Sequence, residues 1–383
     1  KGISFSLYMT HGGTSFGHWA GANSPGFQPD VTSYDYDAPI NEWGLATPKF
    51  YELQKMMAKY NDGKKLPAVP KAPMAIIKVP EFKFTEYKPL SYGIGKEKES
   101  NAPLSFEDMD MGWGTMVYET QVPAIEGTST LTGEFHDFAQ IYVNGKYVGK
   151  IDRVKNEKSL ELPAMPQGAQ LTIVVEGMGR INFGRAIKDY KGIIGNVTLS
   201  TQKQDCELAL TPTRWNNSTI ADDYQTAVNA LAMPTNKMRG LQTKAGYYRG
   251  YFNIKKVGDT FINMEAFGKG QVYVNGHALG RFWQIGPQQT LYLPGCWLKK
   301  GKNEVIVLDV VGPKGEAGKP GSNVAPTAFC QDHPELDKLN LEKSNKHNDP
   351  GHRMDLNSET PVLKGEFKAG NGWQTIKLDK PVT

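Results

Sequence analysis

An internal repeat constrains the fold of this chain more than any other feature of its sequence. Residues 139–149 (A-Q-I-Y-V-N-G-K-Y-V-G) align without a gap with residues 270–280 (G-Q-V-Y-V-N-G-H-A-L-G). Each copy holds Asn-Gly between two arms rich in β-branched and aromatic residues. A type I′ turn needs positive φ at both central residues, which Asn and Gly tolerate. The sequence therefore predicts the same hairpin, with turns at 144–145 and 275–276, in two related β-domains.

Short β-rich segments surround both copies. Residues 171–175 and 304–308 follow the two copies, as expected if each copy belongs to a complete jelly roll. Further predicted strands, short and bounded by Gly, Pro or Asn, are 75–79, 116–120 and 250–254. Runs of strands with few helical periods favour sandwiches over a parallel sheet. The 41 Gly and 24 Pro among 383 residues suit a loop-rich β-protein of two to three domains.

The first 60 residues predict a different kind of unit. Apolar residues 5–9 form a predicted strand that runs into a glycine-rich loop at 10–17. A helix is predicted next, with Thr47 as N-cap and Pro48 at its first position. Its apolar face holds Phe50, Leu53, Met56, Met57 and Tyr60. One βα unit cannot bury its own parallel strand, so we expect more chain before Lys1. The local pattern alone fits either the last unit of a (β/α)₈ barrel or a doubly wound α/β edge.

Two linked motifs in this unit resemble a known family. L-Y-M-T-H-G-G-T-S-F-G-H-W-A-G-A-N at 7–23 and T-S-Y-D-Y-D-A-P at 32–39 are similar to the eighth-strand segment of glycoside hydrolase family 35, the retaining exo-acting β-galactosidases. The likeness continues at 175–184, 189–199 and 270–283, and so covers roughly residues 1–312.

The resemblance implies a mainly β chain with a partial α/β segment. Residues 1–65 correspond to the last βα unit of a TIM barrel, and 66–80 to a Pro-rich linker. Two galactose-binding-like jelly-roll β-sandwiches are expected at 81–203 and 204–312. Residues 313–383 are then a connector and the start of a further, discoidin-like β-domain.

No catalytic residue is expected in this chain. The family's two catalytic glutamates lie in motifs resembling E-N-E-Y-G and E-F-W-x-G-W, and neither motif occurs here. We therefore expect both glutamates upstream of Lys1 and no activity from the chain alone.

Retaining hydrolysis needs two carboxyl groups about 5–5.5 Å apart. Asp35 and Asp37 alternate and could form a pair in extended chain, but we favour bonds to backbone amides in a tight loop that orients the tyrosines.

Tyr8 and Tyr36 are the expected substrate-binding residues. They match the family's strand-end tyrosine and the second tyrosine of T-S-Y-D-Y-D-A-P, which contact galactose and the nucleophile. Tyr34 is assigned to packing. Trp113, flanked by Gly112 and Gly114, is either a sugar platform or a packing residue. The other tryptophans considered are expected in core or interdomain packing, namely Trp215, Trp283, Trp297 and Trp373.

The alternative function is a non-catalytic, lectin-like β-sandwich protein that binds carbohydrate on exposed aromatic rings. No cofactor or metal is expected, because Cys206, Cys296 and Cys330 are widely spaced and His347, Asp349 and His352 lack a regular ligand spacing. A net charge of +4 without a basic stripe argues against nucleic acid, and no apolar run could span a membrane. The resemblance implies β-galactoside glycans as partners and a secreted, periplasmic or lysosome-like compartment.

Overall fold

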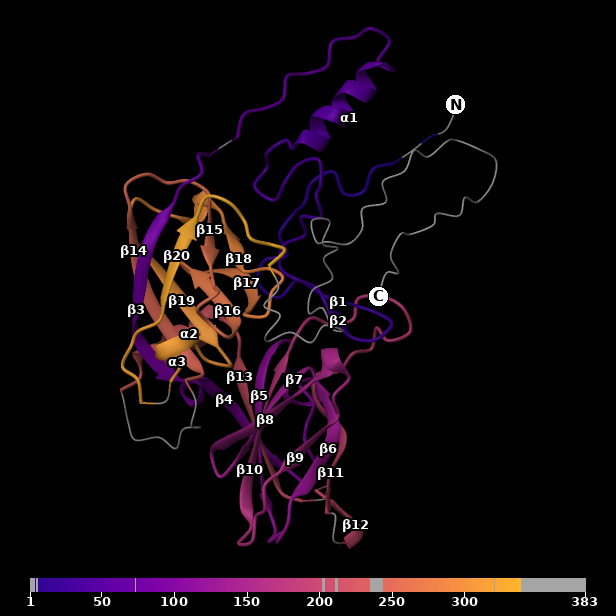
Figure 1. The fold of residues 1–383 in the computed structure, drawn as a ribbon, viewed down its shortest axis with the longest axis vertical. Coiled ribbons are helices and arrows are strands. Elements are labelled where there is room, and N and C mark those ends of the chain that lie inside the picture. Colours follow the sequence, from indigo (N-terminus) through magenta and orange to yellow (C-terminus); the bar gives the residue numbers. More distant parts are fainter. Residues whose placement is uncertain are drawn as a thin grey trace, which may run out of the picture.

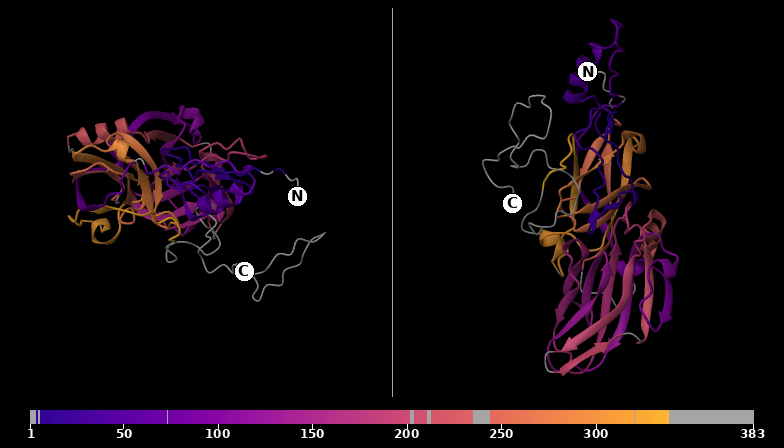
Figure 2. Two further views of the ribbon diagram at one scale, coloured as in Figure 1. Left: turned by 90° about the horizontal axis from the view of Figure 1, so that it is seen from above. Right: turned by 90° about the vertical axis from the view of Figure 1, so that its right-hand side faces the viewer.

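Two β-sandwiches contain all but two of the strands that the structure describes (Figure 1). The computed structural model describes residues 4, 6–72, 74–201, 204–210, 213–234, 244–319 and 321–338. The sandwiches stack lengthwise, and the N-terminal segment runs beside the second one, as the right-hand view of Figure 2 also shows. The expectation of a mainly β chain is confirmed.

The first sandwich consists of a six-stranded and a four-stranded sheet. The larger sheet has the order β4 (Ile94–Ser100), β13 (Trp215–Ala221), β5 (Gly114–Val122), β10 (Ala169–Gly177), β7 (Phe138–Val143) and β8 (Lys146–Asp152). The smaller sheet has the order β12 (Gln204–Ala209), β11 (Gly192–Thr201), β6 (Ser129–His136) and β9 (Ser159–Leu162).

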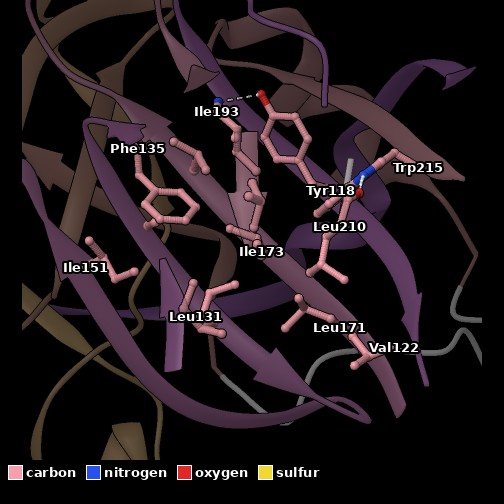
Figure 3. Packing of buried hydrophobic residues seen from close by; sticks show 14 of the residues in the cluster. Tyr118, Val122, Leu131, Phe135, Ile151, Leu171, Ile173, Ile193, Leu210 and Trp215 are labelled. Atoms are coloured by element: carbon pink, nitrogen blue, oxygen red, sulfur yellow. Dashed lines mark hydrogen bonds between the residues drawn. The ribbon is translucent and has the colours of Figure 1, made fainter. Parts of the chain in front are cut away.

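Buried aromatic and aliphatic side chains fill the space between these two sheets (Figure 3). Tyr118 and Trp215 are fully buried, and both have hydrogen-bond partners. The Tyr118 hydroxyl donates to the Leu104 carbonyl oxygen at 2.7 Å, and Trp215 Nε1 donates to the Leu210 carbonyl oxygen at 2.9 Å. Because their polar atoms are paired, these two large residues are buried without an unsatisfied donor.

The second sandwich is built from eight strands that follow one another in a single hydrogen-bonded order. That order is β17 (His277–Trp283), β16 (Lys269–Val274), β19 (Gly301–Asp309), β14 (Gly246–Ile254), β3 (Val79–Pro89), β20 (Thr327–Gln331), β15 (Thr260–Asn263) and β18 (Thr290–Leu293). Phe84, Phe252 and Phe267 lie in its core.

Strand pairing differs from the expected domain boundaries. β3 lies mostly in the span expected for the first sandwich, yet it pairs with β14 and β20 of the second. β13 lies in the span expected for the second sandwich, yet it pairs with β4 and β5 of the first. β20 lies beyond residue 312 and also joins the second sandwich. The reason is burial: Phe84 of β3 packs edge-on against Phe267 with ring centroids 4.9 Å apart, and Trp215 of β13 completes the other core.

The predicted hairpin is present in both copies of the repeat. Asn144 and Gly145 have φ of 50° and 77°, and Asn275 and Gly276 have φ of 50° and 87°. β7 and β8 form the first hairpin, and β16 and β17 form the second. In each hairpin the register shifts directly before a tyrosine, between Ile141 and Tyr142 in the first and between Val272 and Tyr273 in the second. Each hairpin also pairs with the strand predicted downstream of it, β10 or β19.

The two repeats face each other across the junction of the sandwiches. Tyr142 and Tyr273 occupy equivalent positions, and both are buried in one cluster with residues of β10 and β19. The helix α2 (Tyr224–Ala232) adds Ala227, Ala230 and Leu231 to this cluster. The junction is therefore a packed apolar interface that fixes one sandwich against the other. Apart from α1 (Pro48–Ala58) in the N-terminal segment, the other helical elements among the described residues are α3 (Gly315–Gly318) and 3₁₀ turns at Leu90–Gly93, Glu107–Met109, Arg153–Lys155 and Gly295–Trp297.

The N-terminal segment contains the predicted helix but not the predicted strand. Residues 6–9, the described part of the expected strand at 5–9, have no strand partner. A parallel strand needs neighbours, and the described chain places none beside it. Two short strands, β1 (Ala22–Asn23) and β2 (Gln28–Pro29), pair with each other. The helix α1 (Pro48–Ala58) matches the prediction.

The helix α1 is held at its start rather than along its length. Thr47 is its N-cap residue, but the Thr47 hydroxyl donates to the carbonyl oxygens of Ala38 and Pro39 instead of accepting from the first helical amides. Within the described residues of α1, no side chain is buried: Phe50 and Leu53 of the predicted apolar face are half-buried, and its Met56, Met57 and Tyr60 are exposed. None of the helices described is long and apolar enough to cross a membrane.

Candidate functional site

A pocket of about 430 Å³ lies within the N-terminal segment. Its walls are residues 7–9, residues 36–39 with Tyr34, and Lys49 and Leu53 of α1. The structure thus brings Tyr8 and Tyr36, both selected from the sequence, to one pocket. Tyr8 is largely exposed and Tyr36 is 36% exposed.

Tyr34 belongs to the same pocket, although the sequence assigned it to packing. A hydrogen bond with Tyr8 raises the pKa of the Tyr34 hydroxyl above its ordinary value. The Tyr34 and Tyr36 rings meet edge to face with centroids 4.9 Å apart. The alternation Tyr34-Asp35-Tyr36 could have indicated that Tyr34 shares the pocket with Tyr36, because two tyrosines two residues apart can lie on one side of an extended chain.

The two aspartates between these tyrosines do not form a pair. Asp35 is buried, and its carboxylate accepts from the backbone amides of Ala38 at 3.4 Å and Glu42 at 3.0 Å. This confirms the expected role of Asp35 in bonding amides. Asp37 instead has a φ of 58°, points to solvent and forms an ion pair with Lys49 at 2.6 Å. The left-handed backbone at Asp37 breaks the simple alternation on which a pair would depend.

Close packing around Asp35 ties this loop to the glycine-rich loop. A Cβ on Gly12 would lie 2.7 Å from Asp35 Oδ1, so the approach requires glycine there. The buried Glu42 joins the same loops, because its carboxylate accepts from the hydroxyls of Thr14 at 2.6 Å and Ser33 at 3.1 Å. The carboxylates of this segment therefore hold the tyrosine-bearing loop in place.

Trp113 does not line this pocket. Its ring stacks on His18 with centroids 4.8 Å apart and stays half-exposed. His18 Nε2 donates to the Asp222 carbonyl oxygen at 2.8 Å, and His18 Nδ1 lies 3.1 Å from the Gln271 amide nitrogen. Burial lowers the pKa of His18 to about 4, so the imidazole is neutral at pH 7. One face of the Trp113 ring thus packs against a neutral imidazole that hydrogen bonds hold in place.

The other predicted residues lie away from the pocket. Trp215 is buried as expected, and Trp283 and Trp297 pack partly buried against the clusters beside them. In the described part of the chain, no three His, Cys, Asp or Glu side chains gather as metal ligands. Cys296 and Cys330 are free thiols. Trp373, His347, Asp349, His352 and the side chain of Cys206 lie outside what the structure describes.

Three segments of the chain match models of known families. Residues 1–60 match Glycosyl hydrolases family 35. Residues 103–207 match the first all-beta domain of beta-galactosidase, and residues 245–303 match its galactose-binding domain. The first match contains the tyrosine pocket, and the other two contain the two hairpins of the repeat.

Curated relatives match over most of this chain. Human Beta-galactosidase-1-like protein 2 is 34% identical over 328 residues, which cover 82% of this chain and 49% of that protein. Bovine Beta-galactosidase is 33% identical over 336 residues, with coverage of 81% and 49%. Dictyostelium discoideum Beta-galactosidase 1 is 28% identical over 339 residues, with coverage of 80% and 50%. The chain spans about half the length of these relatives.

Proposed function

The chain belongs to glycoside hydrolase family 35, and on that premise we propose that it serves a retaining exo-β-galactosidase that removes terminal β-linked galactose from glycans. The observation that carries this proposal is the convergence of Tyr8, Tyr34 and Tyr36 on one pocket within the segment matched to the family. Aromatic rings suit the apolar face of a pyranose, and phenol hydroxyls can donate to or accept from its hydroxyl groups.

Tyr8 and Tyr36 bind substrate in this proposal. The Tyr36 hydroxyl donates to the nucleophilic carboxylate, which keeps that carboxylate ionised and oriented. Tyr8 bonds a sugar hydroxyl, and its hydrogen bond with Tyr34 sets the direction of both phenols. Residues 1–65 act as the last βα unit of a TIM barrel, in which the exposed apolar side chains of α1 pack against neighbouring units.

In this proposal neither the acid/base nor the nucleophile is a residue of this chain. The support is that the carboxylates near the pocket already have hydrogen-bond or ion-pair partners. Asp35 and Glu42 are buried and accept from backbone amides or hydroxyls, and Asp37 is paired with Lys49. A carboxylate with such bonds is poorly placed to attack an anomeric carbon or to protonate a leaving group. The proposed substrates are β-galactoside glycans. The proposed location of the protein is secreted, periplasmic or in a lysosome-like compartment.

The test is a substitution in an enzyme that contains this segment and a complete barrel. Tyr36→Phe keeps the ring and removes one hydroxyl, so kcat should fall roughly ten- to a hundredfold, the effect of losing one hydrogen bond to a charged group. The matched control is Tyr51→Phe, because Tyr51 lies on α1 outside the pocket and has a similar exposure of 44%. An unchanged kcat in Tyr36→Phe would remove Tyr36 from the site.

The lectin-like alternative is favoured by the half-exposed ring of Trp113. In the enzyme, Trp113→Ala should alter discrimination among leaving groups and leave the simplest aryl galactoside nearly unaffected, because a platform beyond the scissile bond supplies binding rather than chemistry. In the lectin-like alternative, Trp113→Ala would abolish galactose binding by the 383-residue chain, and Tyr36→Phe would leave that binding intact.

A further inference from the structure

A second pocket lies between the two sandwiches, away from the tyrosine pocket. Its volume is about 450 Å³, within the range of about 300–1,000 Å³ that small-molecule sites occupy. One wall comes from β7 and β8 of the first sandwich. The other comes from the end of β17 and the chain at 311–318 in the second. Junctions between domains are preferred places for ligand sites.

Aromatic rings form one part of this inter-sandwich pocket. Tyr147 on β8 meets Tyr142 edge to face at 5.6 Å and remains 46% exposed. Trp283, at the end of β17, lies edge to face with Phe138 at 5.6 Å. The buried Lys269 ammonium lies 4.7 Å from the Trp283 ring centroid and forms an ion pair with Glu176. These contacts fix both rings, so the pocket holds a preformed aromatic surface.

Cationic and amide groups form the other part. The Lys150 side chain is 35% exposed, and its ammonium lies 3.4 Å from Asp152, whose carboxylate is buried beneath it. Lys244 also lines the pocket, and its ammonium donates to the Ser322 carbonyl oxygen at 2.8 Å. Gln284 also lines the pocket. The charged residues that line the pocket are thus two lysines and one aspartate, and the aspartate is buried, so the lining carries a net positive charge.

An added β-strand is a poor occupant for this pocket. β8 is the edge strand of its sheet, and an edge can pair with an extended peptide. However, the hairpin carries a register shift between Ile141 and Tyr142, which twists the edge. Lys146 and Lys150 also lie on this edge, and charged lysines are a common protection of edge strands against pairing.

We propose that the inter-sandwich pocket binds an acidic pyranose, a sugar ring that carries a carboxylate, with the ring against Tyr147 and Trp283 and the carboxylate toward Lys150 and Lys244. A pyranose has an apolar C–H face for the rings and a rim of oxygens for ammonium and amide donors. Its negative charge complements the two lysines. This site is separate from the tyrosine pocket and holds a glycan without cleaving it.

The test is calorimetric titration of the 383-residue chain with methyl galacturonoside and, separately, with neutral methyl galactoside. We expect saturable binding of the acidic sugar, at least about tenfold tighter than the neutral one and weakened by salt. Tyr147→Ala and Lys150→Gln should each weaken it by at least about tenfold. Tyr36→Phe should leave it unchanged, which separates this site from the tyrosine pocket.

Two matched controls guard against general effects of substitution. Tyr190→Ala removes a tyrosine of 44% exposure that lies outside the pocket, and Lys158→Gln removes an exposed lysine elsewhere on the first sandwich. Both should bind as the parent chain does. Equal affinity for the two sugars, no binding at all, or the same loss in the controls would overturn the proposal. Saturable binding of an acidic peptide in the absence of saturable sugar binding would also overturn it. If Tyr147→Ala does not fold, Lys150→Gln decides the outcome alone.

Discussion

Lys191 shows how much of the first sandwich depends on one buried cation. Its ammonium is almost fully buried and reaches Asp137 at 2.6 Å, Asp189 at 2.8 Å and the Gly179 carbonyl oxygen at 3.1 Å. Arg153 reaches the other oxygens of the same carboxylates at 2.7 and 2.8 Å. Burial alone would raise the pKa of Asp189, but Lys191 and Arg153 together lower it. Phe27 lies against both cations, with its ring centroid 4.7 Å from Lys191.

Lys191→Met should therefore destabilise the protein strongly. The substitution leaves two buried carboxylates with one cation, and removal of one partner from a buried ion pair costs about 3–5 kcal/mol. Urea unfolding followed by tryptophan fluorescence measures the change. Lys188→Met, an exposed lysine on the same loop, is the control and should alter the free energy of unfolding by less than about 0.5 kcal/mol. A loss below about 1 kcal/mol in Lys191→Met would contradict this role.

At the scale of single residues, the sequence predicted roles that depend on near neighbours. Asp35 bonds backbone amides within the next seven residues, so its role follows from its place in a tight loop. Lys191 was not predicted, because a lysine in D-Y-K-G suggests a solvent-facing side chain and Asp137 lies 54 residues away. The participation of Tyr34 was missed for the same reason, since its partner Tyr8 comes from another part of the segment.

At the scale of elements, the two hairpins of the repeat form a matched pair for experiment. Asn144 and Asn275 share a φ of 50°, so alanine at either position costs about 1–2 kcal/mol for its left-handed backbone. Their side chains differ. Asn144 accepts one bond, from the Gln170 amide. Asn275 donates to the Trp297 carbonyl oxygen and to Asn303, and accepts from the Glu304 amide.

Asn275→Ala should thus destabilise the protein more than Asn144→Ala. Two further hydrogen bonds at about 1 kcal/mol each give an expected difference of about 2 kcal/mol in the free energy of unfolding. Thermal and urea unfolding of the two variants measures it. Equal losses would show that the side-chain bonds of Asn275 contribute little beyond the turn itself.

The hairpins were predictable because their turn chemistry is local. The same is true of α1, whose proline and apolar spacing lie within its own span. The strand expected at 5–9 is different, because its formation is not decided locally. A parallel strand exists only beside its neighbours, and its sequence carries no information on whether they are present. The described residues 6–9 accordingly form no strand.

At the scale of the whole molecule, the sandwiches are linked by exchange of chain segments. β3 and β13 lie in each other's expected domains, and no local pattern marks that exchange, because either strand would suit either core. The shared cluster around Tyr142 and Tyr273 was equally hidden, although both residues stand in the repeat. Sequence periodicity predicts which side chains are buried but not against which partner they pack.

The exposed apolar side chains of the N-terminal segment predict self-association of the 383-residue chain. They include Leu7, Trp19, Tyr51, Met56, Met57 and Tyr60. Met57→Gln combined with Tyr60→Gln should reduce the apparent mass seen by light scattering and leave Tm unchanged, because neither side chain is buried. Lys59→Gln is a control on the same helix. A chain that is monomeric at all concentrations, or a double variant with a lower Tm, would contradict this prediction.

The most direct test is an assay of the purified 383-residue chain with 4-nitrophenyl β-galactoside. It distinguishes a chain that contributes only substrate-binding residues from one that also holds the catalytic carboxylates. The bonds already made by Asp35, Asp37 and Glu42 predict no turnover above background. The opposite result would be turnover in protein free of contaminating enzyme, abolished by Asp35→Asn or Asp37→Asn. That result would place a catalytic carboxylate in this chain.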